Sequence, residues 1–147
     1  MSETTAKGSC LCGSVSFTVS APLRKVTACH CGQCLKTHGH FSAYTAAPTD
    51  AIHFTEDSGL KWYVSSGIAR RGFCQNCGAS LFYEPTGKSY TSIAAGMIDR
   101  PSGLTSDAHI FVAHKGDYYE IGDDGLPRYD DGMLATRDGK TGEAGQG

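Results

Sequence analysis

Polar and apolar residues alternate strictly over residues 14–20. Val15, Phe17 and Val19 fall on one side of this stretch, and serine and threonine residues fall on the other. A repeat of two residues is typical of a half-buried β-strand. Pro22 follows closely and cannot take part in a central strand, so it ends the pattern. We therefore predict a strand here, with one apolar face directed to a core.

Most of the remaining chain has the same character of short apolar runs separated by glycine, proline and Asp-Ser-Gly turns. The further strands that this pattern predicts are 40–46, 51–54, 60–64, 68–73, 80–84, 89–95 and 109–113. A single helical turn is expected over 32–38, with Gly39 as its stop. No window has the pattern of a long amphipathic helix. The expected fold class is mainly β, with stacked antiparallel sheets and little helix.

Length and charge limit the organisation and the class of protein. The chain has 147 residues, which suits one domain, and we place it at 8–131. The flanking segments 1–7 and 132–147 are polar and are expected to be flexible. A net charge of −2 argues against a non-specific nucleic-acid binder. Because no stretch resembles a secretory signal or a membrane span, we expect a cytoplasmic protein.

The seven cysteines are clustered, which packing alone does not explain. They form one group of three and two close pairs, namely Cys29, Cys31 and Cys34, then Cys10 with Cys12, and Cys74 with Cys77. An odd count and such short spacings fit a disulfide framework badly, because bridges across so few residues are strained. Metal binding is the better interpretation of clustered thiols in a reducing compartment.

The two pairs, Cys10/Cys12 and Cys74/Cys77, each precede a glycine and together make a four-thiolate set. Four thiolates are the closed tetrahedral ligand set of a structural zinc site. The remaining Cys29, Cys31 and Cys34 supply three ligands and leave one position open, as in catalytic zinc sites. We therefore predict two Zn²⁺ ions per chain, one structural and one of the catalytic type.

Several alternatives stay open at this point. His30 lies between two of the central thiols and could supply a fourth ligand, although its ring is expected to point away from them. Cys10 and Cys12 could join the central group instead. All seven thiols could also be buried without metal, or Cys31 and Cys34 could form a redox dithiol. His38 and His40 flank the central group, either as surface histidines or as acid–base groups.

The order and spacing of these motifs resemble the glutathione-dependent formaldehyde-activating enzyme family, which includes centromere protein V. The matching elements are Cys10-Leu-Cys12-Gly13, Cys29-His30-Cys31-Gly-Gln-Cys34, Arg71-Gly-Phe73-Cys74-Gln-Asn-Cys77-Gly78, Ala95-Gly-Met-Ile-Asp99-Arg-Pro101 and His109-Ile-Phe-Val-Ala-His-Lys115. The resemblance implies a zinc-bound fold of stacked β-sheets. It also implies a structural zinc on Cys10, Cys12, Cys74 and Cys77 and a catalytic-type zinc on Cys29, Cys31 and Cys34.

The activity that the resemblance implies is that of a carbon–sulfur lyase, which joins glutathione to formaldehyde to give S-(hydroxymethyl)glutathione. The expected partner is accordingly a small thiol such as glutathione. Lys36, Arg70 and Arg71 are candidates to hold its carboxylates, or are ordinary surface charges. The alternative is a non-catalytic zinc module that binds a protein or nucleic acid. A thiol-sensing role for a labile central zinc is a third possibility.

Overall fold

The computed structural model describes residues 4–132 of the chain. Contacts divide this part into two compact units, one of residues 4–25 and 45–104 and one of residues 26–44 and 105–132. The domain boundary at 8–131 stays a prediction, and residues 1–3 and 133–147 of the two expected flexible segments lie outside the described residues.

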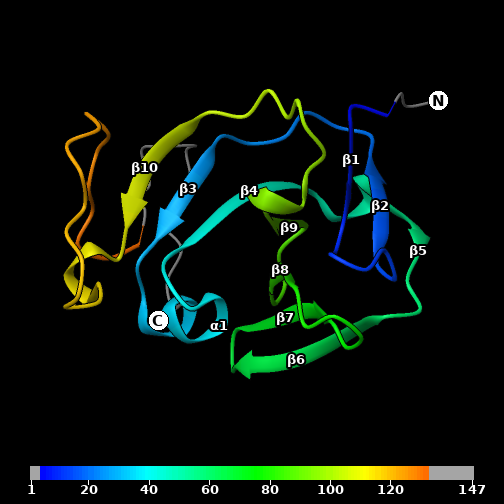
Figure 1. Ribbon diagram of the computed structural model, residues 1–147, viewed down its shortest axis with the longest axis horizontal. Coiled ribbons are helices and arrows are strands. Elements are labelled where there is room, and N and C mark those ends of the chain that lie inside the picture. Colours follow the sequence, from blue (N-terminus) through cyan, green and yellow to red (C-terminus); the bar gives the residue numbers. More distant parts are fainter. Residues whose placement is uncertain (1–3, 133–147) are drawn as a thin grey trace. The chain divides into compact units, whose positions relative to one another are not determined.

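The first unit contains two antiparallel sheets (Figure 1). The smaller sheet has the order β1-β2-β5, made of β1 (Ala6–Ser9), β2 (Ser16–Val19) and β5 (Ile52–Glu56). Four neighbouring strands of the larger, seven-stranded sheet lie wholly in this unit, namely β6 (Leu60–Ser66), β7 (Ala69–Cys74), β8 (Ser80–Pro85) and β9 (Tyr90–Ala94). Two 3-10 turns complete the unit, η1 (Thr49–Ala51) and η2 (Ala95–Met97).

Aromatic side chains join the two sheets of the first unit. Val15, Phe17 and Val19 are almost fully buried, as the alternation over 14–20 predicts. The ring of Phe17 on β2 lies 5.4 Å from that of Phe82 on β8, and Phe54 on β5 lies 5.7 Å from Phe82. These edge-to-face contacts stack one sheet on the other. The expected class, mainly β with stacked antiparallel sheets, is confirmed.

The second unit is built on β3 (Val26–Cys29) and its neighbours. It pairs antiparallel with the first residues of β4 (Ser42–Pro48) and parallel with β10 (Ser106–Ile110). Helix α1 (Gly32–His38) connects β3 to β4 and ends at Gly39, whose φ of 80° is left-handed. This is the helix and the stop that the sequence predicts. Turn η3 (Val112–His114) follows β10.

Strands β1 and β3 are absent from the sequence prediction, and β10 has bounds other than the predicted 109–113. Strand β1 begins at Ala6, within a segment expected to be flexible, because its backbone pairs with β2 without any need for apolar side chains. Strand β10 ends at Ile110, before the predicted end at residue 113. There Phe111 takes a left-handed conformation, with a φ of 56°, and turns the chain out of the strand. Within residues 4–132, no helix has the length and apolar character needed to cross a membrane.

Candidate metal centres

Four thiols meet in the first unit. The Sγ atoms of Cys10, Cys12, Cys74 and Cys77 all lie within 4.8 Å of one another. Cys10 Sγ is 3.8 Å from Cys12 Sγ, which is 3.7 Å from Cys74 Sγ. With a Zn–S bond near 2.3 Å, tetrahedral geometry places neighbouring sulfur atoms about 3.8 Å apart. The donor set and its spacing therefore fit a tetrahedral zinc ion.

Tight turns bring these thiols to a common point. Gly13 and Gly78 directly follow the two cysteine pairs and have φ values of 84° and 81°, which side-chain-bearing residues rarely adopt. The backbone N–H of Val15 donates to Cys10 Sγ at 3.3 Å, and that of Cys77 donates to Cys74 Sγ at 3.5 Å. Such N–H groups stabilise sulfur in its thiolate form, which is the form that binds metal.

Backbone donors also act on the more exposed members of the group. The N–H groups of Ala79 and Cys12 hold the pKa of the Cys77 thiol at about 6, below its ordinary value. Hydrogen bonds from the Ser14 side chain and backbone lower the pKa of Cys12. Both shifts favour the thiolate form, which is the form that binds metal.

The second group of thiols lies in the second unit and comes from three successive structural positions. Cys29 is the last residue of β3, Cys31 is the N-cap of α1, and Cys34 lies in the first turn of the helix. Their Sγ atoms lie within 4.8 Å of one another, and all three residues are buried. The Cys34 backbone N–H donates to Cys31 Sγ at 3.3 Å, so the helix cap itself orients one thiol.

Three buried thiols at this spacing cannot all ionise without a cation. The Cys31 and Cys34 thiols, together with burial, raise the pKa of Cys29 far above its ordinary value. A divalent soft metal ion would offset the repulsion of the three thiolates. Within residues 4–132, no fourth histidine, cysteine or acidic side chain joins this group. The three residues thus fit a metal ion that keeps a position for another ligand.

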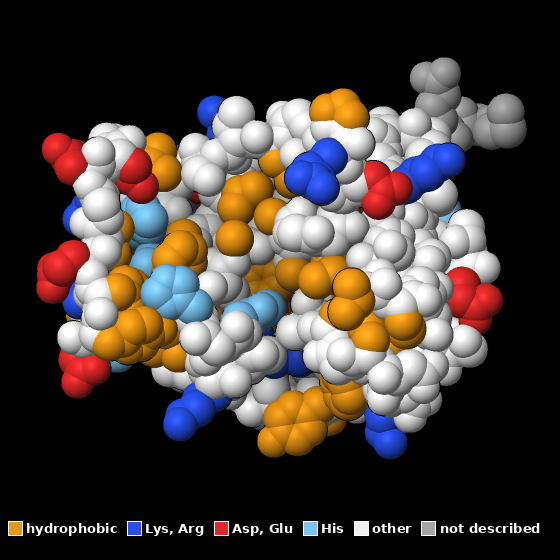
Figure 2. Space-filling view, viewed as in Figure 1, with side chains coloured by type: hydrophobic (Ala, Val, Ile, Leu, Met, Phe, Trp, Pro, Cys, Tyr) orange, Lys and Arg blue, Asp and Glu red, His pale blue; other side chains and the backbone are white. Residues whose placement is uncertain are grey.

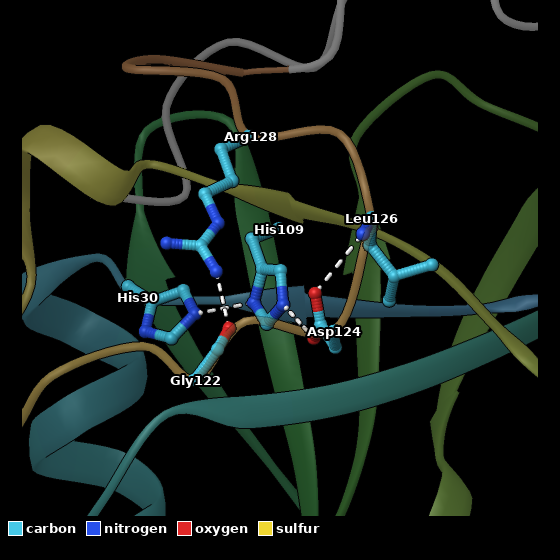
Figure 3. A network of polar contacts seen from close by, with 6 residues as sticks. All are labelled: His30, His109, Gly122, Asp124, Leu126 and Arg128. Atoms are coloured by element: carbon cyan, nitrogen blue, oxygen red, sulfur yellow. Dashed lines mark hydrogen bonds and ion pairs between the residues drawn. The ribbon is translucent and has the colours of Figure 1, made fainter.

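His30 does not supply that ligand. Its ring is fully buried and uses both nitrogens elsewhere, with Nδ1 2.7 Å from Tyr119 Oη and Nε2 3.0 Å from His109 Nδ1. His109 in turn lies 2.7 Å from Asp124 through Nε2 (Figure 3). Burial and the nearby His109 lower the pKa of His30 to about 4, so its ring is neutral near pH 7. The expectation that this ring points away from the thiols holds.

The two flanking histidines are bound to tyrosines. His38 Nε2 lies 2.9 Å from Tyr44 Oη, and His40 Nδ1 lies 2.6 Å from Tyr118 Oη. The ring of His40 also contacts those of Phe41 and Tyr119 at centroid distances of 4.6 Å. Figure 2 shows histidine side chains among hydrophobic ones over the region of β3, β10 and α1. These contacts make an aromatic surface in the same unit as the second thiol group.

The three cationic side chains considered for binding carboxylates belong to different units. Lys36 is exposed on α1, in the unit of the second thiol group. Arg70 and Arg71 belong to β7 in the first unit. There Arg70 pairs with Glu84 at 2.7 Å and lies over the ring of Trp62, and Arg71 lies over the ring of Tyr83. A role for these three side chains in holding carboxylates stays untested.

Three residues near the second group carry no assignment from the sequence. His109 belongs to the matching segment His109-Ile-Phe-Val-Ala-His-Lys115, but the sequence suggests no role for it. Tyr119 and Asp124 lie in a polar segment with no periodic pattern. Only the tertiary structure brings His109 and Tyr119 to His30, which lies 79 and 89 positions before them in sequence. Asp124 joins the group through its contact with His109. The single available signal is that a buried histidine needs partners for both ring nitrogens.

The other cysteine alternatives can be compared with this geometry. Cys10 and Cys12 lie with Cys74 and Cys77, not with the central group. None of the seven cysteines is in a disulfide. Cys31 and Cys34 do begin a helix, as redox dithiols do, but β3 and β4 are antiparallel and the setting is not βαβ.

Comparison with known proteins gives three findings. The family model described as glutathione-dependent formaldehyde-activating enzyme matches residues 5–114. "Uncharacterized lyase C29B12.13" of Schizosaccharomyces pombe is 30% identical over 117 residues, which span 78% of this chain and 84% of that protein. The crystal structure of a Rhodobacter sphaeroides protein matches with a TM-score of 0.54 at 16% identity, covering 84% of this chain and 98% of that one. At that identity, the structural likeness supports the fold alone.

Proposed function

Since the chain belongs to the glutathione-dependent formaldehyde-activating enzyme family, we propose that it is a zinc-dependent enzyme of the carbon–sulfur lyase type. Its substrates in this proposal are a small thiol of the glutathione type and formaldehyde or a related electrophile. The second thiol group is the reaction centre, and the Cys10, Cys12, Cys74 and Cys77 group holds a structural ion. The chain then carries two Zn²⁺ ions.

One observation supports this assignment above the others. Cys29, Cys31 and Cys34 gather three buried thiols, and the described residues offer no fourth ligand of the usual kinds. His30, the nearest candidate in sequence, has both ring nitrogens occupied. Structural zinc sites have four protein ligands, whereas catalytic ones have three and keep a position for substrate.

The reaction in this proposal forms one carbon–sulfur bond. The thiol sulfur attacks the carbonyl carbon, and the thiol proton ends on the carbonyl oxygen to give a hydroxymethyl thioether. A bound zinc ion supplies positive charge that keeps a coordinated thiol deprotonated. The three cysteine thiolates are soft donors, so this donor set favours sulfur over oxygen as the additional ligand. The aromatic side chains of His40, Phe41 and Tyr118 belong to the same unit, and in this proposal they contact apolar parts of the substrate.

The test is an exchange measurement. Metal-loaded protein is mixed with glutathione and ¹³C-formaldehyde, and NMR exchange spectroscopy measures the rate at which adduct and free aldehyde interconvert. We expect wild-type protein to accelerate the exchange and Cys31→Ser to leave it at the uncatalysed rate. Elemental analysis shows whether the variant keeps one metal ion per chain. If protein with two ions leaves the rate unchanged across several thiols and aldehydes, the non-catalytic binding module takes the place of this proposal.

A further inference from the structure

A hydrogen-bonded chain of four side chains ends beside the second thiol group. It runs from Asp124 through His109 and His30 to Tyr119, with contacts of 2.7, 3.0 and 2.7 Å. Figure 3 shows the first three of these residues in line. The two histidines are buried, whereas the Asp124 side chain is 41% exposed. A buried polar chain of this kind is stabilising only when each member has a partner.

The donors and acceptors of this chain follow from its outer end. The hydrogen bond with His109 lowers the pKa of Asp124, so Asp124 is a carboxylate and can only accept. His109 therefore donates through Nε2, and in its neutral form it accepts through Nδ1. His30 then donates through Nε2 and accepts at Nδ1 from the hydroxyl of Tyr119. One carboxylate thus selects the tautomer of both rings.

Asp124 is itself held in place by backbone contacts. Its second carboxylate oxygen accepts from the Leu126 N–H at 3.0 Å. The His109 backbone N–H donates to Pro127, and its carbonyl accepts from Tyr129, both at 2.9 Å. The guanidinium of Arg128 donates to the Gly122 carbonyl, as Figure 3 also shows. The segment that carries Asp124 is therefore fixed to β10 through residues 127–129, and Arg128 ties Gly122 to the same stretch.

His30, the member of the hydrogen-bonded chain that lies between two of the cysteines in sequence, acts on the thiols through the backbone. His30 stands between Cys29 and Cys31 in extended chain, so its ring and the two thiols project to opposite sides. The His30 backbone N–H donates to Ile110 at 3.0 Å. With the ring held through both nitrogens, the peptide units on either side cannot rotate freely. The directions of the two thiols are fixed with them.

We propose that Asp124 is a positioning residue of the Cys29, Cys31 and Cys34 site, acting through His109 on the tautomer and orientation of His30. That site binds a soft divalent metal ion in this proposal. The inference therefore rests on the proposed metal site but not on the proposed reaction. Partners outside the ligand sphere that orient a site contribute about 10- to 100-fold in metal affinity. Asp124 belongs to this class although it touches none of the thiols.

The test compares Asp124→Ala with Asp123→Ala, a change of the same charge at the neighbouring exposed residue. Substitution of the exposed Asp124 side chain opens no cavity in a core. Competition with a chromogenic chelator measures the affinity of each metal ion, and the four-thiol site of the same chain serves as an internal reference. We expect Asp124→Ala to weaken the ion of the second group about 10- to 100-fold and to leave the first unchanged. Asp123→Ala changes neither.

A second readout separates positioning from a general loss of structure. Long-range ¹H–¹⁵N spectra report the tautomer of each histidine ring, and substitution of the other four histidines in turn assigns the signals of His30 and His109. Wild-type protein shows a proton on Nε2 of both rings. In Asp124→Ala both rings lose this fixed tautomer, and in Asp124→Asn, which keeps an oxygen acceptor, the metal affinity is partly restored.

Three results overturn the inference. These are unchanged tautomers in Asp124→Ala, equal metal affinity in Asp124→Ala and Asp123→Ala, and an equal loss of affinity at both metal sites. The last would show that Asp124 merely stabilises the fold. Metal binding without thiol–aldehyde exchange in the wild-type protein would overturn the proposed reaction and leave the role of Asp124 intact.

Discussion

Cys12 Sγ and Cys74 Sγ lie 3.7 Å apart, although 62 positions separate them in sequence. A metal ion held between such distant segments closes a long loop and restricts the unfolded chain. Its binding free energy also adds directly to the free energy of folding, because the unfolded chain has no preformed site. The two thiol groups should therefore differ in what they contribute. We expect the first to stabilise the fold and the second to serve the proposed reaction.

Metal content and stability should separate the two groups. We expect elemental analysis to give two zinc ions per wild-type chain, and one in Cys77→Ser and in Cys31→Ser. Cys77→Ser should lower the unfolding midpoint strongly, and a chelator should do the same to the wild-type protein. Cys31→Ser should lower the unfolding midpoint less, because its three thiols lie within six residues and a metal ion there closes only a short loop. A midpoint that falls more for Cys31→Ser than for Cys77→Ser would reverse the assignment of structural and catalytic sites.

Gly59 has no room for a side chain beside the first group. A Cβ atom there would lie 2.7 Å from Ser14 Cβ and 2.9 Å from Cys74 Sγ. Gly59 also bonds Ser14 and Gln75 through its backbone, so the chain cannot easily move away. We expect Gly59→Ala to weaken metal binding at this group and to destabilise the protein by about 1–3 kcal/mol.

Gly67→Ala is the matched control for this change, because a Cβ at Gly67 meets nothing within 4 Å. Denaturant unfolding of the two variants gives the free energies, and chelator competition gives the metal affinity. Equal effects of the two substitutions would show that close approach to Cys74 is not the cause.

Phe17 should dominate the packing between the two sheets of the first unit. It is 1% exposed and contacts the rings of both Phe54 and Phe82. Truncation to alanine leaves a cavity between stacked sheets, so we expect Phe17→Ala to cost about 3–5 kcal/mol. Phe54 contacts the rings of Phe17 and Phe82 but is 40% exposed. In a urea titration of both variants, Phe54→Ala should therefore lower the free energy of unfolding by less than half as much as Phe17→Ala. A larger loss of stability in Phe54→Ala would contradict this account of the core.

The parts of the fold that follow a local rule could be predicted from sequence. The alternation around Phe17 gives β2 and its buried face, and Gly39 gives the end of α1, since both depend on neighbours in the chain. Strand β1 could not be predicted in this way. Its residues Ala6–Ser9 carry no apolar pattern and become a strand only by pairing with β2.

The same division applies to the candidate sites. Clustered cysteines can be identified as candidate metal ligands from sequence, because thiols at such spacing rarely serve another purpose. Tyr119 and Asp124 give no such signal, because their significance arises only from the distant histidines that they contact. Similarly, the left-handed Phe111 ends β10 at Ile110, although the run over 109–113 predicts a strand that continues to residue 113. Residues that act through tertiary partners are visible only once those partners are known.

Tyr119 should ionise unusually late. Burial raises the pKa of its hydroxyl above its ordinary value near 10, and the neighbouring Tyr118 and Cys29 act in the same direction. A hydrogen bond with the Gly116 backbone opposes the shift, and the Lys115 ammonium lies 5.3 Å from the ring centroid. The contact with His30 is therefore made by a neutral phenol throughout the neutral pH range.

This raised pKa has a consequence for stability at alkaline pH. A group whose pKa is higher in the folded than in the unfolded state stabilises the protein fully below the unfolded value and loses that contribution as pH rises past it. The stability of wild-type protein should therefore fall above pH about 10 more steeply than that of Tyr119→Phe. Absorbance at 295 nm follows tyrosine ionisation, and Tyr119→Phe should lack one step that lies above the ordinary tyrosine range. Tyr63→Phe, which changes a tyrosine that is 63% exposed and does not act on Tyr119, is the control. If the step lost in Tyr119→Phe instead lies in the ordinary tyrosine range, the hydroxyl is not held in the buried contact with His30.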